Sequence, residues 1–321
     1  MKPLTFHPLL KRIRWGGRRL GSMLHKPIGP EADYAESWEI ADHGGDQTIV
    51  SRGDFDGLSL SELVIQQNVP LLGRHAGRNQ FPLLVKFLDA ADVLSVQVHP
   101  DDRQAKAFDP TENGKTEAWV ILDAQSNSEI FVGLKSGVTA KDMTTALQDG
   151  TVEQLLHRIQ VRPGDCVFVP AGTVHAIGEG VLLAEIQQSS DLTFRLYDWG
   201  RLGADGQPRQ LHLKEALHCI DFDRGPVAPI QPVLLSSDHD HEELVRSSEF
   251  VLQRHRSSRP FSLRQDDACH VLMVLAGSGT LQAGEDELNL SLGQTVLLPA
   301  DRDHVVITPH EELMLLDAFL P

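Results

Sequence analysis

The chain has 321 residues, of which 41% are hydrophobic and 23% are charged, close to the averages for soluble globular proteins. This composition excludes a disordered chain and a disulfide-stapled mini-protein, and the length predicts two or three domains. Lys and Arg number 29 against 45 Asp and Glu, which gives a formal net charge of −16 at pH 7. The electric field of such a negative protein repels a phosphate backbone, so we expect no nucleic-acid binding. Any anionic substrate must then be captured by a local basic cluster.

The cysteines and the N-terminus indicate a cellular compartment. Cys166, Cys219 and Cys269 are odd in number and widely spaced, which is typical of free thiols in a reducing environment. The basic N-terminal stretch is interrupted by Trp15-Gly16-Gly17, and no apolar run of signal-peptide length follows. No stretch reaches the roughly 20 apolar residues of a membrane-spanning helix. We therefore expect a cytoplasmic protein with no membrane association.

Short runs rich in Val, Ile, Leu and Phe alternate with Gly, Pro, Asp and Asn, and this pattern predicts a mainly β fold. The runs expected to form one sheet-rich body are 83–88, 93–98, 117–122, 129–134, 166–169, 181–186 and 193–197. Helices are expected to be few and short. Capping boxes at 59–62 and 139–142 predict two of them, the second opening a helical insert over about 139–159.

An internal repeat gives the architecture. The pattern Gly-x5-Pro-x4-His occurs at Gly164, Pro170 and His175 and again at Gly293, Pro299 and His304. The glycine permits a turn with positive φ, the apolar residues after it form a strand, and the proline ends pairing before a loop that returns with the histidine. The repeat predicts two double-stranded β-helix (jelly-roll) domains, which we place at 1–235 and 236–321.

A candidate metal site lies in the first repeat. Gln97 and His99 are two residues apart and therefore share one face of a strand. Glu117 begins the next strong strand, and His175 ends the repeat motif. An isolated histidine on a strand is more often a satisfied structural residue, but two nitrogens and two oxygens in this arrangement suit Zn²⁺ and other borderline divalent metals.

The second repeat lacks this ligand set. Nothing like Gln-x-His precedes its first strand, and His270 stands where Glu117 stands in the first repeat. We interpret this domain as a degenerate structural partner that covers a sheet face, with His304 as a remnant or surface residue. His239 and His241 lie in the acidic stretch 238–243, which we interpret as the linker between the domains.

Three short segments of the sequence resemble a known protein family. Leu94-Ser95-Val96-Gln97-Val98-His99-Pro100-Asp101-Asp102, Gly114-Lys115-Thr116-Glu117 and Thr193-Phe194-Arg195-Leu196-Tyr197-Asp198-Trp199-Gly200-Arg201 resemble class I mannose-6-phosphate isomerases of the cupin superfamily. The likeness runs from Trp15-Gly16-Gly17 to about residue 215, and the length of the chain resembles that of the shorter bacterial members. The C-terminal third resembles the family only in its general cupin pattern.

The resemblance implies a reaction. Members of this family interconvert mannose 6-phosphate and fructose 6-phosphate by moving a proton between C1 and C2 through a cis-enediol, with no redox cofactor. A bound divalent cation, expected to be one Zn²⁺ per chain or another divalent metal, would stabilise the negative charge that develops on the two oxygens. The implied partner is a small sugar phosphate.

The resemblance also implies residue roles. It assigns the metal ligands to Gln97, His99, Glu117 and His175, the set already reached from spacing. It places Ser95, Lys86 and Lys115 in the substrate pocket with the phosphate nearby, gives Arg195 to catalysis, and adds Trp15 and Glu36 to the pocket. An N-terminal Trp is more often explained by simple packing. The proton carrier stays open between Glu185, Lys115 and a metal-bound water, and Glu185 equally suits orientation of a ligand.

Two other functions compete with the isomerase. A non-catalytic sugar-binding or regulatory cupin is disfavoured because a binding module has no need for Arg195 beside an enediolate. A cupin dioxygenase is disfavoured because such iron sites usually hold several histidines, whereas this set has two. The sequence leaves the native metal and the oligomeric state open.

Overall fold

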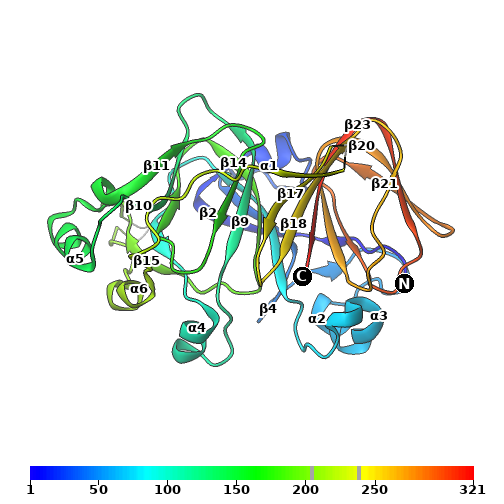
Figure 1. The fold of residues 1–321 in the computed structure, drawn as a ribbon, viewed down its shortest axis with the longest axis horizontal. Coiled ribbons are helices and arrows are strands. Elements are labelled where there is room, and N and C mark those ends of the chain that lie inside the picture. Colours follow the sequence, from blue (N-terminus) through cyan, green and yellow to red (C-terminus); the bar gives the residue numbers. More distant parts are fainter. Residues whose placement is uncertain (203–205, 237–239) are drawn as a thin grey trace.

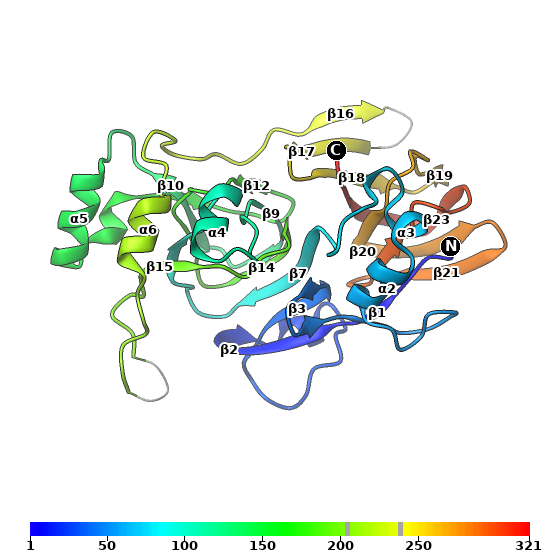
Figure 2. The ribbon, with the colours of Figure 1, turned by 90° about the horizontal axis from the view of Figure 1, so that it is seen from below.

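The computed structural model describes residues 1–202, 206–236 and 240–321 and shows two bodies of antiparallel sheet side by side (Figures 1 and 2). The prediction of a mainly β fold is confirmed. The first body has a six-stranded and a five-stranded sheet, and the second has an eight-stranded sheet. No helix in the described part of the chain is long and apolar enough to cross a membrane.

The six-stranded sheet runs in the order β12 (Cys166–Val169), β9 (Glu117–Ala124), β14 (Val181–Gln188), β7 (Leu83–Ala90), β3 (Tyr34–Ile40) and β2 (Leu9–Gly17). The five-stranded sheet runs in the order β11 (Leu156–Gln160), β10 (Glu129–Leu134), β13 (His175–Ile177), β8 (Val96–Val98) and β15 (Phe194–Tyr197). Each of the seven predicted runs forms a strand, although the run 93–98 is in strand geometry only at its end.

The eight-stranded sheet has a main path of β16 (Val233–Ser236), β17 (Asp240–Arg246), β18 (Val251–Ser257), β23 (Val305–Phe319), β20 (His270–Ala283) and β21 (Asp286–Ser291). Off this path, β19 (Phe261–Ser262) pairs with β23, and β22 (Thr295–Leu298) pairs with β20. Two short ribbons complete the strands, β1 (Phe6–His7) with β6 (Ile49–Val50) and β4 (Asp42–His43) with β5 (Asp46–Gln47).

The helices are short, as predicted. They are α1 (Arg19–Ser22), α2 (Leu60–Gln66), α3 (Asn68–Leu72), α4 (Asp102–Phe108), α5 (Ala140–Asp149) and α6 (Leu213–Cys219), with 3-10 turns at Gly73–His75 and Val152–Leu155. Both predicted capping boxes form, at Ser59 before α2 and at Thr139 before α5. The predicted insert is wrong at its end, because 156–160 is strand β11: Leu156 and Ile159 are buried there and β11 pairs with β10.

The two repeats adopt the same local structure. Gly164 and Gly293 have φ of 94° and 80°, and each begins the turn before a strand, β12 or β22. In register, Val169 lies opposite Glu117 and Leu298 lies opposite His270, so each proline follows the last paired residue of its strand. The internal repeat therefore predicted a real structural correspondence, in which His270 occupies the position of Glu117.

The second body covers the outer face of the six-stranded sheet. Along β14, Leu182, Ala184 and Ile186 belong to a hydrophobic cluster that also contains Phe250 and Leu316 of the second body. Because side chains alternate across a strand, the residues between them point the other way, into the first barrel. This packing agrees with the interpretation of the C-terminal domain as a partner that covers a sheet face.

The predicted linker differs from the structure. The C-terminal sheet already begins with β16 at Val233, so a boundary at 235/236 falls inside a strand. His241 lies in β17 and stacks on His255 at a ring distance of 4.1 Å, so its interpretation as a linker residue was wrong. His239 lies outside the described residues. The division at 235/236 itself stays a prediction.

We predict that the two repeat glycines differ in their tolerance of alanine. Gly164→Ala should cost about 1–2 kcal/mol through the positive φ alone, because only open space and a distant Arg254 guanidinium surround its missing Cβ. A Cβ at Gly293 would lie 2.2 Å from the Leu24 carbonyl oxygen, and this overlap should cost about 2 kcal/mol more. Urea unfolding of both variants measures the difference, and equal losses would contradict it.

Candidate metal centre

Strand alternation brings the polar residues of the first barrel to its interior. Lys86 on β7, Glu117 on β9 and Glu185 on β14 alternate with residues of the outer hydrophobic cluster and therefore point inward. From the facing sheet, His175 on β13 lies opposite Gln97 on β8. The barrel thus collects residues that lie far apart in the sequence.

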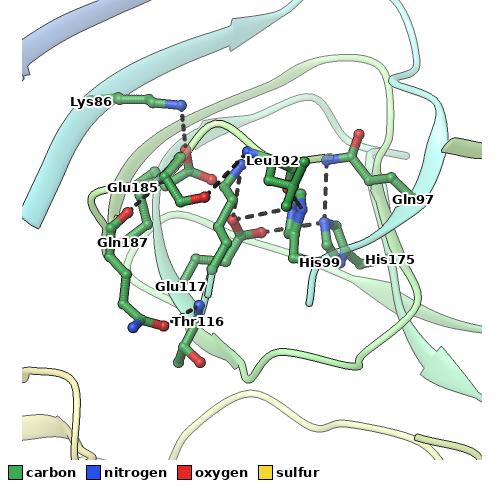
Figure 3. A network of polar contacts seen from close by, with 12 residues as sticks. Lys86, Gln97, His99, Thr116, Glu117, His175, Glu185, Gln187 and Leu192 are labelled. Carbon is green, nitrogen blue, oxygen red and sulfur yellow. Dashed lines mark hydrogen bonds and ion pairs between the residues drawn. The ribbon is translucent and has the colours of Figure 1, made fainter. Parts of the chain in front are cut away.

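The predicted metal ligands meet inside the barrel (Figure 3). Glu117 Oε1 lies 3.3 Å from His175 Nε2, and Glu117 Oε2 lies 3.6 Å from His99 Nε2. One ligand atom from each of these residues falls within 4.8 Å of the others. Gln97 joins them, since its Nε2 lies 3.3 Å from His175 Nε2. A half-turn of the amide would present its oxygen as a fourth ligand.

The donor atoms are oriented toward one point. His99 Nδ1 lies 2.9 Å from the Leu192 carbonyl oxygen and His175 Nδ1 lies 2.9 Å from that of Thr173, so both Nδ1 atoms carry the proton and donate it. The lone pair is then on Nε2. His99 Nε2 and both Glu117 carboxylate oxygens are buried without a hydrogen-bond partner. Buried polar atoms are almost always satisfied, so this donor set fits a divalent cation.

Burial also sets the protonation of the ligands. It lowers the pKa of His99 well below its usual value and that of His175 to about 3, so both imidazoles are neutral, as metal ligands must be. Burial, followed by the charge of Glu185, raises the pKa of Glu117 to about 8. A cation between the three side chains would offset this cost and favour the carboxylate.

A cavity of about 620 Å³ opens from this centre. Its wall includes all the residues predicted to bind substrate or to act in catalysis, namely Ser95, Lys86, Lys115, Trp15, Glu36, Glu185 and Arg195. Trp15 lines the cavity and also packs in the inner hydrophobic cluster, so both explanations of this residue hold in part. Sequence reasoning missed further lining residues, among them Lys11, Trp38, Asp191, Arg209 and His212.

Lys86 is enclosed at one end of the cavity. Its Nζ lies 3.4 Å from Glu36 and 3.5 Å from Glu185, and 4.6 Å from the centre of the Trp38 ring. Burial opposes its charge, but the two carboxylates more than offset burial and raise the pKa of Lys86. Trp119 Nε1 donates to Glu185 at 2.9 Å, which fixes the orientation of that carboxylate.

Two further cations face the metal centre. Lys115 Nζ lies 3.6 Å from Glu117 Oε2, so it touches the ligand carboxylate. Arg195 on β15 lies opposite Gln97, and its Nε donates to Ser95 Oγ at 3.0 Å. Burial, followed by the positive charge of Arg209, lowers the pKa of Arg195.

The second barrel holds a different group at the same position. His270 Nδ1 lies 2.7 Å from Asp317 and its Nε2 lies 3.1 Å from Asp266. Burial opposes the charge of the ring, but the two carboxylates prevail and raise the pKa of His270 to about 9. His304 is exposed and contacts Ser262 Oγ at 3.1 Å, as expected of a surface residue. An imidazolium between two carboxylates leaves no lone pair for a metal.

The fold and this site define a two-barrel cupin with a buried His-Glu-His centre in the first barrel. Two protein families match the chain, one in each part. The family described as phosphomannose isomerase type I, catalytic domain, matches residues 4–116, and the mannose-6-phosphate isomerase cupin domain matches residues 240–316.

Individual relatives match almost the whole chain. Mannose-6-phosphate isomerase ManA of Bacillus subtilis is 38% identical and covers 93% of both chains, and mannose-6-phosphate isomerase of Streptococcus mutans is 34% identical over 93% and 92%. The crystal structure of the Bacillus subtilis mannose 6-phosphate isomerase superposes with a TM-score of 0.91 at 31% identity, covering 99% of each chain. The chain therefore belongs to the type I mannose-6-phosphate isomerase family.

We predict that His270 makes folding stability pH-dependent. Its folded-state pKa of about 9 exceeds the ordinary 6.5, so its contribution is complete below pH 6.5 and is lost as the pH rises through about 9. The loss should be on the order of 3 kcal/mol. Urea unfolding between pH 6.5 and 9.5 should show this slope in the wild type and a flatter one in His270→Gln; parallel slopes would contradict the prediction.

Proposed function

We propose that the protein interconverts mannose 6-phosphate and fructose 6-phosphate by moving a proton between C1 and C2 through a cis-enediol. The observation that carries the proposal is the buried His99–Glu117–His175 group, which has unsatisfied ligand atoms and opens into a cavity lined by Lys115 and Arg195. Membership of the family, with relatives named for this reaction, supports the substrate.

We further propose that Gln97, His99, Glu117 and His175 hold one Zn²⁺. When bound, the cation supplies a Lewis acid that stabilises negative charge on the C1 and C2 oxygens of the sugar. Lys115 balances the charge of the ligand carboxylate Glu117, which it touches at 3.6 Å. Arg195 lies opposite Gln97 and carries a permanent positive charge, so it adds to the same stabilisation.

Glu185 is the proposed proton carrier. It points into the same barrel interior as Glu117, and its two oxygens contact Trp119 and Lys86, which hold the carboxylate in one orientation. A base must be fixed within reach of the carbon it deprotonates, and these contacts provide that constraint. Lys115 is the alternative carrier, because it also lines the cavity beside the metal ligands.

The walls of the cavity position the sugar. Trp15 offers an apolar surface, while Glu36 and Lys86 form an ion pair at 3.4 Å that supplies both an acceptor and a donor for hydroxyl groups.

We also propose a cytoplasmic location, because Cys166, Cys219 and Cys269 are buried, unpaired thiols, as in proteins of reducing compartments.

Metal removal tests the reaction directly. Purified protein should convert mannose 6-phosphate into fructose 6-phosphate, lose this activity after treatment with a chelator, and regain it with Zn²⁺, because the cation stabilises the enediolate. A coupled assay for fructose 6-phosphate measures all three states. Full activity of metal-free protein would contradict the proposed mechanism, and substrate binding without turnover in the zinc-loaded protein would favour the non-catalytic sugar-binding cupin.

Two substitutions separate catalysis from metal binding. Arg195→Ala should reduce kcat/KM by about a hundredfold or more while the metal stays bound, because this side chain stabilises substrate charge without being a ligand. His175→Ala should lose the metal itself, because it removes one of the buried ligands. Metal content by atomic absorption, measured beside the kinetics, distinguishes them. Equal metal loss in both variants would show that Arg195 acts structurally.

A further inference from the structure

Most cationic side chains on the cavity wall are already neutralised. Lys11 pairs with Asp46, and Lys115 touches Glu117 at 3.6 Å. A phosphate ester carries up to two negative charges and is bound most strongly by cations whose charge is not already shared with a carboxylate. A phosphate is therefore expected to bind the cationic side chains of the cavity that are least paired with carboxylates.

The Lys86 end of the cavity does not meet this requirement. Its ammonium lies between Glu36 at 3.4 Å and Glu185 at 3.5 Å, and the side chain is only 3% exposed. A phosphate placed there would approach two carboxylates at close range. Repulsion between like charges at such distances in a partly buried site opposes binding.

The opposite end of the cavity has uncompensated charge. Figure 3 shows Lys86 and Gln97 on opposite sides of the His-Glu-His group. Next to Gln97, Arg195 donates to Ser95 Oγ at 3.0 Å and to the Gln210 carbonyl oxygen at 3.2 Å. Among the ion pairs within 4.0 Å in the described part of the chain, none involves Arg195.

Arg209 adds a second guanidinium at this end. It also lines the cavity, and the bond from Arg195 to Gln210 holds this segment against Arg195. Its Nη1 lies 3.5 Å from Asp198 Oδ1, but Arg201 already binds the same oxygen at 2.6 Å. The positive charges of Arg195 and Arg209 repel each other. An anion bound between these two guanidinium groups would relieve the repulsion.

We propose that Arg209 binds the phosphate group of the substrate beside Ser95, with Arg195, which lies opposite Gln97, between this group and the metal centre. Ser95 Oγ also lies 3.4 Å from Gln97 Oε1, so the proposed phosphate site adjoins the metal centre. This inference rests on the proposed function, and it makes the arginine pair the determinant that selects phosphorylated sugars.

The kinetic test uses Arg209→Gln and Arg209→Lys. Loss of a charge-assisted contact should raise KM for mannose 6-phosphate about ten- to a hundredfold, with kcat within about threefold of wild type and metal content unchanged. Arg209→Lys should recover part of the affinity. Arg158→Gln is the matched control, because Arg158 lies on β11, pairs with Glu129 and does not line the cavity.

A binding measurement makes the test independent of turnover. Calorimetric titration of inorganic phosphate into chelator-treated protein should show binding to wild type and Arg158→Gln, and none to Arg209→Gln. Unchanged KM and unchanged phosphate binding in Arg209→Gln would overturn the proposal, as would a loss of kcat at constant KM. Absence of turnover in zinc-loaded wild type would instead defeat the proposed function, while the titration would still decide the phosphate site.

Discussion

The carboxylate of Glu117, buried between two neutral imidazoles, is the constraint on which the site depends. Its oxygens have no hydrogen-bond partner among the described residues, and Lys115 Nζ, 3.6 Å from Oε2, is the ammonium group beside them. A buried charge is very costly unless it is paired. The barrel wall buries the three side chains, and the Nδ1 bonds of His99 and His175 direct both Nε2 lone pairs inward. Lys115 contacts only one of these atoms, whereas a divalent cation would satisfy all of them together.

The remaining charges are arranged around this centre in two ways. On one side, Lys86 lies between Glu36 and Glu185, so its positive charge is more than balanced by two carboxylates. On the other side, Arg195 and Arg209 share little negative charge and remain available to an anion. This arrangement of charges suits a substrate that undergoes proton transfer at one end and carries a negative charge at the other.

The two barrels show how one scaffold supports different chemistry. Glu117 and His270 occupy the same register position, and Glu185 and Asp317 each lie two residues before the strand partner of that position. In the first barrel the central residue is a carboxyl group whose two oxygens have no hydrogen-bond partner. In the second it is an imidazolium whose two nitrogens are satisfied by Asp266 and Asp317. The two centres therefore differ in what satisfies the buried groups, because the first has ligand atoms that fit a divalent cation and the second has a proton held between two carboxylates.

The sequence by itself determined the mainly β class, the two repeats, both capping boxes and the four ligand candidates, because these depend on local spacing and on strand alternation. It placed β11 within a helical insert, since buried residues in a short segment fit either period until a partner strand is known. It also missed strands β2 and β3, the Trp38 contact and Arg209. Those features were decided by tertiary structure, because sheet pairing and the sharing of charges between distant residues exist only once the chain has folded.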